Sequence, residues 1–289
     1  MTTMTTMTTT TEMRANDDDC EVCQSLSPHV STTRRLVVQN LSVGYQGQAI
    51  LPALSFEVHA GEVWALFGPN GGGKSTLLRT LLGLQPPLAG RVDLCGSELA
   101  AVPQRQDLDA LVPQRSLDVV RDGTLRGWSF LRPWMTRDAK AAIAQAARDT
   151  DIEALLHQPF RELSEGQKHR VLIARALAGN TGLLTLDEPT SAMDPFHEEA
   201  IFRLVEKVTV ARELGVIVSS HHMHILTEIA SSAIYVDREM HVAISGPFHE
   251  IAAHPTVLAR YGVLMASRPC HSLGELHVLA PIAPDEGTL

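Results

Sequence analysis

One stretch decides the fold of this chain, and it reads Gly68-Pro69-Asn70-Gly71-Gly72-Gly73-Lys74-Ser75-Thr76. It matches the pattern G-x-x-x-x-G-K-S/T, and it lies between the apolar run 63–67 and the apolar segment 74–82. A glycine-rich turn between a strand and a helix directs backbone N–H groups at an anion, and the helix N-terminus adds its positive dipole end. The sequence therefore predicts a phosphate-binding loop for ATP, in which Lys74 reaches the β- and γ-phosphates and the Ser75 hydroxyl binds Mg²⁺.

Segments with strand and helix character alternate on both sides of this loop. The helix that follows the loop is expected to run from Lys74 to Leu82 and to end at Gly83. This alternation indicates an α/β fold with a largely parallel sheet that helices cover on both faces. The expected strands lie at residues 36–38, 54–58, 63–67, 91–95, 183–186, 216–219 and 233–236.

The chain divides into units of different composition. Its beginning is low in complexity and rich in Thr and Asp, so we expect a disordered tail there. A helical insertion is expected at about 116–165, with Thr136 as the N-cap of a helix over 137–148. The expected units are a disordered tail at 1–34, one folded domain at 35–262 and a C-terminal extension at 263–289.

Composition and charge exclude several classes of protein. A formal net charge of -9 argues against a broad basic surface for nucleic acid, so no nucleic-acid partner is expected. No run approaches the roughly 18 apolar residues of a membrane-spanning helix, and the N-terminus has no secretory signal, which predicts a cytoplasmic protein. Cys20 and Cys23 have the spacing of half a zinc site, but no second pair follows, so we interpret them as incidental.

Two acidic residues end the apolar run Leu183-Leu184-Thr185-Leu186-Asp187-Glu188. Taken alone, such a pair is more often a solvated turn. Together with a phosphate loop, it is typical of a buried strand that delivers carboxylates to the nucleotide. Asp187 is then expected to hold Mg²⁺, and Glu188 to polarise the attacking water as general base.

The sequence Leu163-Ser164-Glu165-Gly166-Gln167 resembles the signature of the ATP-binding cassette (ABC) ATPases, which usually reads Leu-Ser-Gly-Gly-Gln. The order of phosphate loop, signature, acidic strand and then His221 also matches this family. The resemblance covers about residues 36–262. It implies a phosphate-loop core with a mainly parallel sheet, an antiparallel β part around 36–60 and the helical insertion.

The resemblance also assigns roles to single residues, and ATP and Mg²⁺ are the implied cofactors. Tyr45 lies where the family stacks an aromatic ring on adenine, and His221 resembles the histidine that contacts the γ-phosphate. Gln114 resembles the glutamine that touches Mg²⁺ and water, and we prefer it to Gln104, which has the same local sequence, because Gln114 falls about 40 residues after Lys74. Asp194 resembles the residue that links two active sites. The implied catalytic residues are Glu188, His221, Lys74 and Gln114; the implied nucleotide ligands are Tyr45, the loop residues 68–76, Ser164, Gly166, Gln167 and Asp194; the implied metal ligands are Ser75, Gln114 and Asp187.

Two departures from the family concern rate and fine geometry. Glu165 replaces a signature glycine, and His222 replaces the aspartate that usually follows the switch histidine. A metal site at His221, His222 and His224 is the less favoured interpretation, because consecutive histidines on a turn point in different directions.

The resemblance finally implies partners. A single cassette implies a head-to-tail dimer, in which Lys74 of one copy and Ser164 of the other bind the same ATP. A separate membrane permease and a substrate-binding protein are expected, so the chain would be peripheral on the inner face of the membrane. The stretch 112–120 resembles subunits of zinc, manganese or chelated-metal importers. The alternative is a soluble ABC ATPase, for example in iron–sulfur cluster assembly.

Overall fold

The computed structural model describes residues 31–102, 114–125, 135–188, 195–220 and 223–262. A six-stranded sheet lies at the centre in the order β11-β10-β5-β9-β8-β7. All neighbouring strands in it are parallel except β10 and β11, which form an antiparallel hairpin. The strands of this sheet are β5 (Val63–Phe67), β7 (Leu99–Val102), β8 (Leu183–Asp187), β9 (Gly215–Ser219), β10 (Ser232–Asp237) and β11 (Val242–Pro247).

The strand β5 joins the two apolar cores of the molecule. Val63, Ala65 and Phe67 pack in a core with the helices on one face of the sheet. Trp64 and Leu66 pack in the other core, which includes the helix α2 (Lys74–Leu81). All five residues are buried, and the period of two in a strand sends alternate side chains to opposite faces. The end of this strand, where the phosphate loop begins, is therefore held from both sides.

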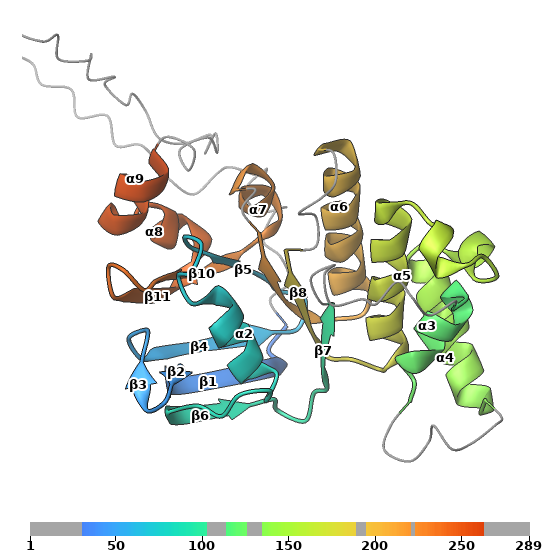
Figure 1. The fold of residues 1–289 in the computed structure, drawn as a ribbon, viewed down its shortest axis with the longest axis horizontal. Helices are drawn as coiled ribbons and strands as arrows, with labels where there is room; N and C mark the ends of the chain where they lie inside the picture. Colours follow the sequence, from blue (N-terminus) through green and yellow to red (C-terminus); the bar gives the residue numbers. More distant parts are fainter. Residues whose placement is uncertain (1–30, 103–113, 126–134, 189–194, 221–222, 263–289) are drawn as a thin grey trace, which may run out of the picture.

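A second, antiparallel sheet lies at the lower left of Figure 1, where β4 packs against β11. Its order is β4-β1-β6, and β1 pairs with both neighbours. This confirms the predicted antiparallel part and, with the mainly parallel central sheet, the predicted fold class. Its strands are β1 (Arg34–Ser42), β4 (Leu54–His59) and β6 (Ala89–Asp93), and a small hairpin of β2 (Gly44–Tyr45) and β3 (Gln48–Ala49) follows β1.

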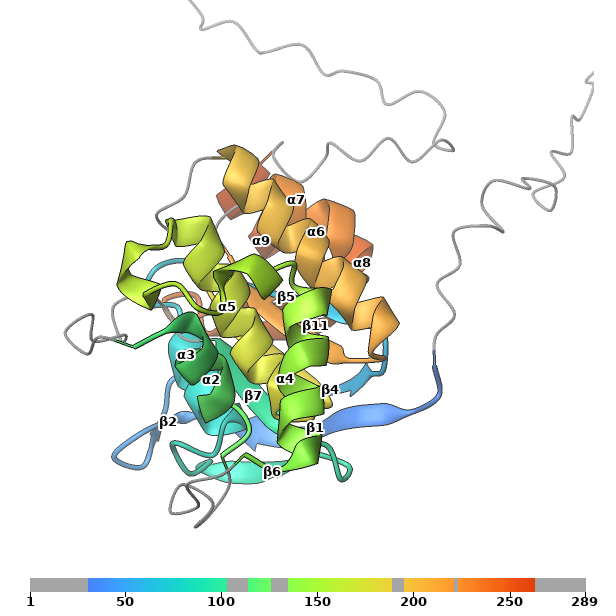
Figure 2. The same cartoon turned by 90° about the vertical axis from the view of Figure 1, so that its right-hand side faces the viewer.

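The helical part lies beside the central sheet, as Figure 2 shows from the side of these helices. Both α3 (Ser116–Asp122) and α4 (Arg137–Asp149) pack against α5 (Glu165–Ala178). The Oγ1 of Thr136 accepts a hydrogen bond from the N–H of Ala139 at 3.1 Å, which confirms the predicted N-cap. Two 3₁₀ turns, Glu153–Leu155 and Phe160–Glu162, connect α4 to α5.

Four more helices complete the described part of the chain. In this part, none of the helices is both long enough and apolar enough to cross a membrane. The short α8 and α9 pack together, and α8 lies against β10 and β11. These helices are α6 (Pro195–Ala211), α7 (Met223–Ile229), α8 (Phe248–Ala252) and α9 (Pro255–Tyr261).

Two strands of the central sheet were not expected from the sequence. The edge strand β7 has the sequence Leu99-Ala100-Ala101-Val102, in which alanine is a weak strand former and burial is incomplete. The other, β11, ends in Ser-Gly-Pro, a combination typical of a turn. Pairing with β8 and with β10 overrides both local preferences.

Candidate functional site

The phosphate loop connects the end of β5 to the start of α2. Lys74 is the first residue of this helix and is 7% exposed. Its Nζ donates hydrogen bonds to the carbonyl oxygens of Gly68 at 3.0 Å and Pro69 at 3.2 Å, so the lysine spans its own loop. Burial lowers the pKa of Lys74, while the negative charges of Glu188 and Asp187 act in the opposite direction. The loop thus presents a helix N-terminus and a cation at one place, as phosphate binding requires.

The loop is packed directly on the end of β10. A Cβ atom added to Gly68 would lie 2.0 Å from the carbonyl oxygen of Val236, and one added to Gly72 would lie 2.9 Å from the same oxygen. No side chain fits at either position without moving this backbone. The glycines of the motif are therefore needed for close packing against β10 as well as for access of the phosphates.

A small pocket of about 130 Å³ opens beside the loop. Tyr45 lines it, and the Tyr45 hydroxyl is hydrogen-bonded to the Oγ1 of Thr76 at 2.9 Å. This side chain is tethered at its tip, yet the residue is 47% exposed, so a ring surface is available for stacking. The structure thus brings Tyr45 to the loop. The pocket is lined by Tyr45, Ile50, residues 71–76 and Arg238, of which Ile50 and Arg238 were not predicted.

Asp187 and Glu188 lie where β8 leaves the sheet, at the same edge as the loop. Asp187 is paired with Ser219 of β9, and the N–H of Glu188 donates to the carbonyl oxygen of Ser219 at 3.0 Å. Burial is the main cause that raises the pKa of Asp187; the Ser219 side chain and the charge of Lys74 act against it, and the charge of Glu188 adds to it. Glu188 has a positive φ of 46°, which lies in the left-handed region that residues other than glycine seldom adopt. Asp187, Glu188 and Lys74 are therefore close enough for their charges to interact.

The signature sequence builds the start of α5. The Oγ of Ser164 accepts from the N–H of Gln167 at 3.3 Å, and the Gln167 side chain accepts from the N–H of Ser164 at 2.9 Å. This reciprocal pair is a capping box, which fixes the first turn of the helix. Glu165, at the position of the usual glycine, forms an ion pair with Lys168 at 3.0 Å. The residues that line the loop pocket do not include any from α5, so one copy of the chain does not bring Ser164 or Gly166 to its own pocket.

Gln114 lies at the entry to α3, with an exposed side chain. Its carbonyl oxygen accepts from the N–H of Phe160 at 2.9 Å, and Arg115 forms a bridge with Pro159. These contacts place it in the helical part, and none of the described contacts joins it to the loop. By contrast, β7 ends at Val102, which pairs with the residue just before Asp187.

Some predicted residues lie outside the described part of the chain. They are Cys20, Cys23, Gln104, Asp194, His221 and His222. The described residues contain no group of three His, Cys, Asp or Glu side chains that could hold a metal ion.

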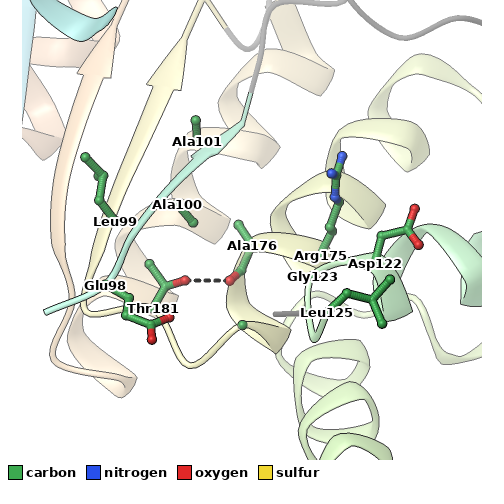
Figure 3. Close-up of a pocket in the computed structure, with 11 residues that line it drawn as sticks. Glu98, Leu99, Ala100, Ala101, Asp122, Gly123, Leu125, Arg175, Ala176 and Thr181 are labelled. Atoms are coloured by element: carbon green, nitrogen blue, oxygen red, sulfur yellow. Dashed lines mark hydrogen bonds between the residues drawn. The ribbon is translucent and has the colours of Figure 1, made fainter. Parts of the chain in front are cut away.

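A second pocket, of about 380 Å³, lies between the sheet edge and the helical part (Figure 3). The strand β7 forms one side, and the ends of α3 and α5 form the other. Arg175, Asp122 and Leu125 project from the helical side, and Leu125 is 36% exposed. The Oγ1 of Thr181 donates to the carbonyl oxygen of Ala176 at 2.7 Å, which holds the segment after α5 against the end of that helix. We call this second pocket the β7–α5 groove.

Comparisons with known proteins identify relatives of the whole folded region. The family model described as "ABC transporter" matches residues 51–191. The zinc import ATP-binding protein of Yersinia pseudotuberculosis is 33% identical over 228 residues, which cover 78% of this chain and 85% of that protein. The protein of the same name from Magnetococcus marinus is 31% identical over 234 residues, which cover 78% of this chain and 82% of its own length.

Solved structures agree with this relationship. A structure of a putative metal-chelate type ABC transporter in an inward-facing conformation superposes with a TM-score of 0.71. The two chains are 27% identical, and the match covers 79% of this chain and 89% of the other. The phosphate loop, the acidic end of β8 and the signature sequence thus lie in a chain that is similar to these relatives in both sequence and fold. The chain belongs to the ABC transporter family and is an ATP-binding, ATP-hydrolysing subunit.

Proposed function

We propose that this ATPase drives the uptake of a divalent metal ion or a metal chelate through a separate membrane permease. The observation that carries this proposal is the similarity to zinc import ATP-binding proteins over 78% of the chain. The similarity to a metal-chelate type transporter supports the same class of cargo. The alternative of an iron–sulfur assembly ATPase finds no support in these relatives.

The geometry of the phosphate loop and of the acidic end of β8 supports a separate role for each residue there. The loop and Lys74 would bind the phosphates, with Tyr45 against the adenine ring. The Ser75 hydroxyl and the Asp187 carboxylate are hard oxygen donors, which fit Mg²⁺, and the metal would neutralise charge on the phosphates. Glu188 would polarise the attacking water. His221 and Asp194 keep the roles that the family implies, at the γ-phosphate and between the two sites.

We assign the glutamine that touches the metal and water to Gln104 rather than Gln114. Gln104 follows the end of β7 by two residues, and Val102 pairs with the residue before Asp187. Because Val102 pairs with Leu186, directly before Asp187, the sequence that follows β7 is the better candidate for this role. Gln114 follows twelve residues after Val102, and its backbone is bonded to Phe160 in the helical part.

A second copy of the chain would complete each ATP site. The capping box uses the Ser164 oxygen as an acceptor, so the hydroxyl hydrogen is still able to donate to a phosphate of an ATP held by the partner copy. Gly166 lies in the same helical turn and has no side chain. This head-to-tail dimer explains why Ser164 and Gly166 do not line the pocket of their own copy.

The β7–α5 groove supports the docking of the permease. It lies between β7 of the central sheet and the ends of α3 and α5, so it contacts both the sheet and the helical part. A short helix of the permease seated there would move with the helical part when the dimer closes. Attachment through this groove would hold the chain on the inner face of the membrane, and a substrate-binding protein would deliver the cargo outside.

Metal content of cells tests the proposed cargo. Cells that lack this chain should accumulate less zinc or manganese in a chelator-treated medium, as measured by mass spectrometry of whole cells. The wild-type chain should restore the metal content, and the Glu188→Gln variant, expressed to the same level, should not. If metal contents are the same with and without the chain while ATP hydrolysis is intact, the cargo is of another class.

A further inference from the structure

Arg238 lies on the wall of the loop pocket, although no motif of the sequence points to it. It follows β10 in the turn to β11, and it is exposed. Within the described part of the chain, its guanidinium takes part in no hydrogen bond or ion pair. An exposed cation without a protein partner beside a phosphate loop is placed to meet an anionic ligand.

The position of Arg238 relative to the loop is fixed by β10. The carbonyl oxygen of Val236, two residues before it, is so close to the loop that Cβ atoms added to Gly68 and Gly72 would lie 2.0 Å and 2.9 Å from it. The strand also pairs in register with β5, with Tyr235 opposite Phe67 at the start of the loop. The turn therefore begins in direct contact with the phosphate-binding backbone.

The turn itself is held by the fully buried carboxylate of Asp237. One oxygen accepts from the N–H groups of Glu239 at 2.9 Å and Met240 at 3.1 Å. The other accepts from the Tyr235 hydroxyl at 3.0 Å and from the Arg260 guanidinium at 2.8 Å. Four donors on one carboxylate leave the turn little freedom, and they tie it to α9.

The neighbouring cations are already engaged. Arg260 is paired with Asp237 at 2.8 Å and with Glu239 at 3.2 Å. Lys74 donates to carbonyl oxygens of the loop. Arg238 is thus the cation of this wall that a ligand can use without breaking a contact in the described part of the chain.

The pocket also decides which end of the nucleotide Arg238 meets. The pocket runs from Tyr45 and Ile50 on the adenine side to the loop residues 71–76, and Asp187 and Glu188 do not line it. Arg238 thus shares the adenine side of the loop rather than the side of the two acids. We infer that Arg238 is a further nucleotide-binding residue, which donates to the phosphate nearest the adenosine and is positioned by Asp237 and Arg260. This inference rests on the proposed assignment of the loop as the ATP site.

Binding and kinetics of an Arg238→Ala variant test this role. Because ATP and ADP share the phosphate nearest the adenosine, the Kd of both should rise by the same factor, about three- to tenfold for a solvent-exposed charged contact. The KM for ATP should rise with them, and kcat should not change. Arg238→Lys keeps the charge without the planar fork, so it should give an intermediate Kd. The matched control is Arg203→Ala, which removes another exposed arginine, from α6, and should leave both Kd values unchanged.

Three outcomes would overturn the inference. They are unchanged Kd values for both nucleotides, a loss for ATP alone, or a fall in kcat without a change in KM. The Lys74→Ala variant, measured in parallel, separates this question from the loop assignment. If Lys74→Ala loses nucleotide binding while Arg238→Ala does not, only the role of Arg238 fails.

Discussion

The loop pocket and the β7–α5 groove differ in how they are built. The loop pocket takes most of its lining from the continuous stretch 71–76, whose backbone is packed on β10. The β7–α5 groove takes its lining from β7, the end of α3 and the end of α5, segments that lie far apart in the sequence. A tight contiguous loop suits a ligand that is the same in every family member, whereas a wall of separate segments can vary with the partner. In the proposed function, ATP hydrolysis and coupling to the permease thus use different kinds of surface.

The largest expected effect on ATP hydrolysis comes from Glu188, where hydrolysis can be separated from ATP binding. Changing Glu188 to Gln preserves size and hydrogen bonding but removes the general base, so hydrolysis should fall about 10²- to 10⁴-fold while ATP still binds. In the proposed dimer, hydrolysis is the step that reopens the two copies, so this variant should accumulate as an ATP-bound dimer on size-exclusion chromatography, whereas the wild type should run mainly as a monomer. Asp187→Asn should instead weaken Mg²⁺-dependent binding, and Lys74→Ala should abolish both binding and hydrolysis. Hydrolysis by Glu188→Gln at close to the wild-type rate would show that Glu188 is not the base.

An intermediate effect on hydrolysis should distinguish Gln104 from Gln114. If Gln104 contacts the metal and the water, Gln104→Ala should lower kcat about ten- to a hundredfold through loss of positioning, with little change in the Kd for ATP. Gln114→Ala should leave kcat unchanged, because the described contacts of Gln114 lie in the helical part. Steady-state ATPase rates of the two purified variants measure the difference. The reverse result would return the role to Gln114.

The smallest effect on hydrolysis is expected in the groove. Leu125→Asp places a charge on its partly exposed apolar side, so we expect normal ATPase activity of the purified protein but loss of attachment to membranes that contain the permease. Co-sedimentation with such membranes measures the attachment. Leu258→Asp is a suitable control, because Leu258 is a similarly exposed leucine on α9, away from the groove. A permease that binds Leu125→Asp as well as it binds the wild type would exclude the groove as the docking site.

Local sequence predicts this chain best where a short segment contains the whole determinant of a structure. The helix after the loop was expected to end near Leu82 and Gly83, and it ends at Leu81 with Gly83 at a φ of +71°. The strand β5 has the predicted bounds, and Thr136 caps α4 as expected. In each case, an apolar run, a glycine or a capping side chain acts on neighbours within four residues.

The choice between Gln104 and Gln114 illustrates the limit of this approach. Counting residues from Lys74 favoured Gln114, because loop lengths between elements were unknown. The pairing of β7 with β8 supports our proposal of Gln104 instead, and β7 itself is too short and too rich in alanine to be identified from its sequence. A strand of this kind forms only because a partner strand supplies its hydrogen bonds.

By itself, the sequence determined the phosphate loop, the acidic pair and the signature, because each is a contiguous pattern whose local geometry follows from backbone rules. It also determined the fold class, because strand and helix patterns alternate along the chain. Only the tertiary structure decided that Arg238 reaches the loop pocket, since Arg238 lies 164 positions after Lys74 and is brought there by the pairing of β10 with β5. The same holds for the β7–α5 groove, which exists only where α3 and α5 pack beside an edge strand. Contacts between distant segments depend on the summed packing of both apolar cores, and no local pattern carries that information.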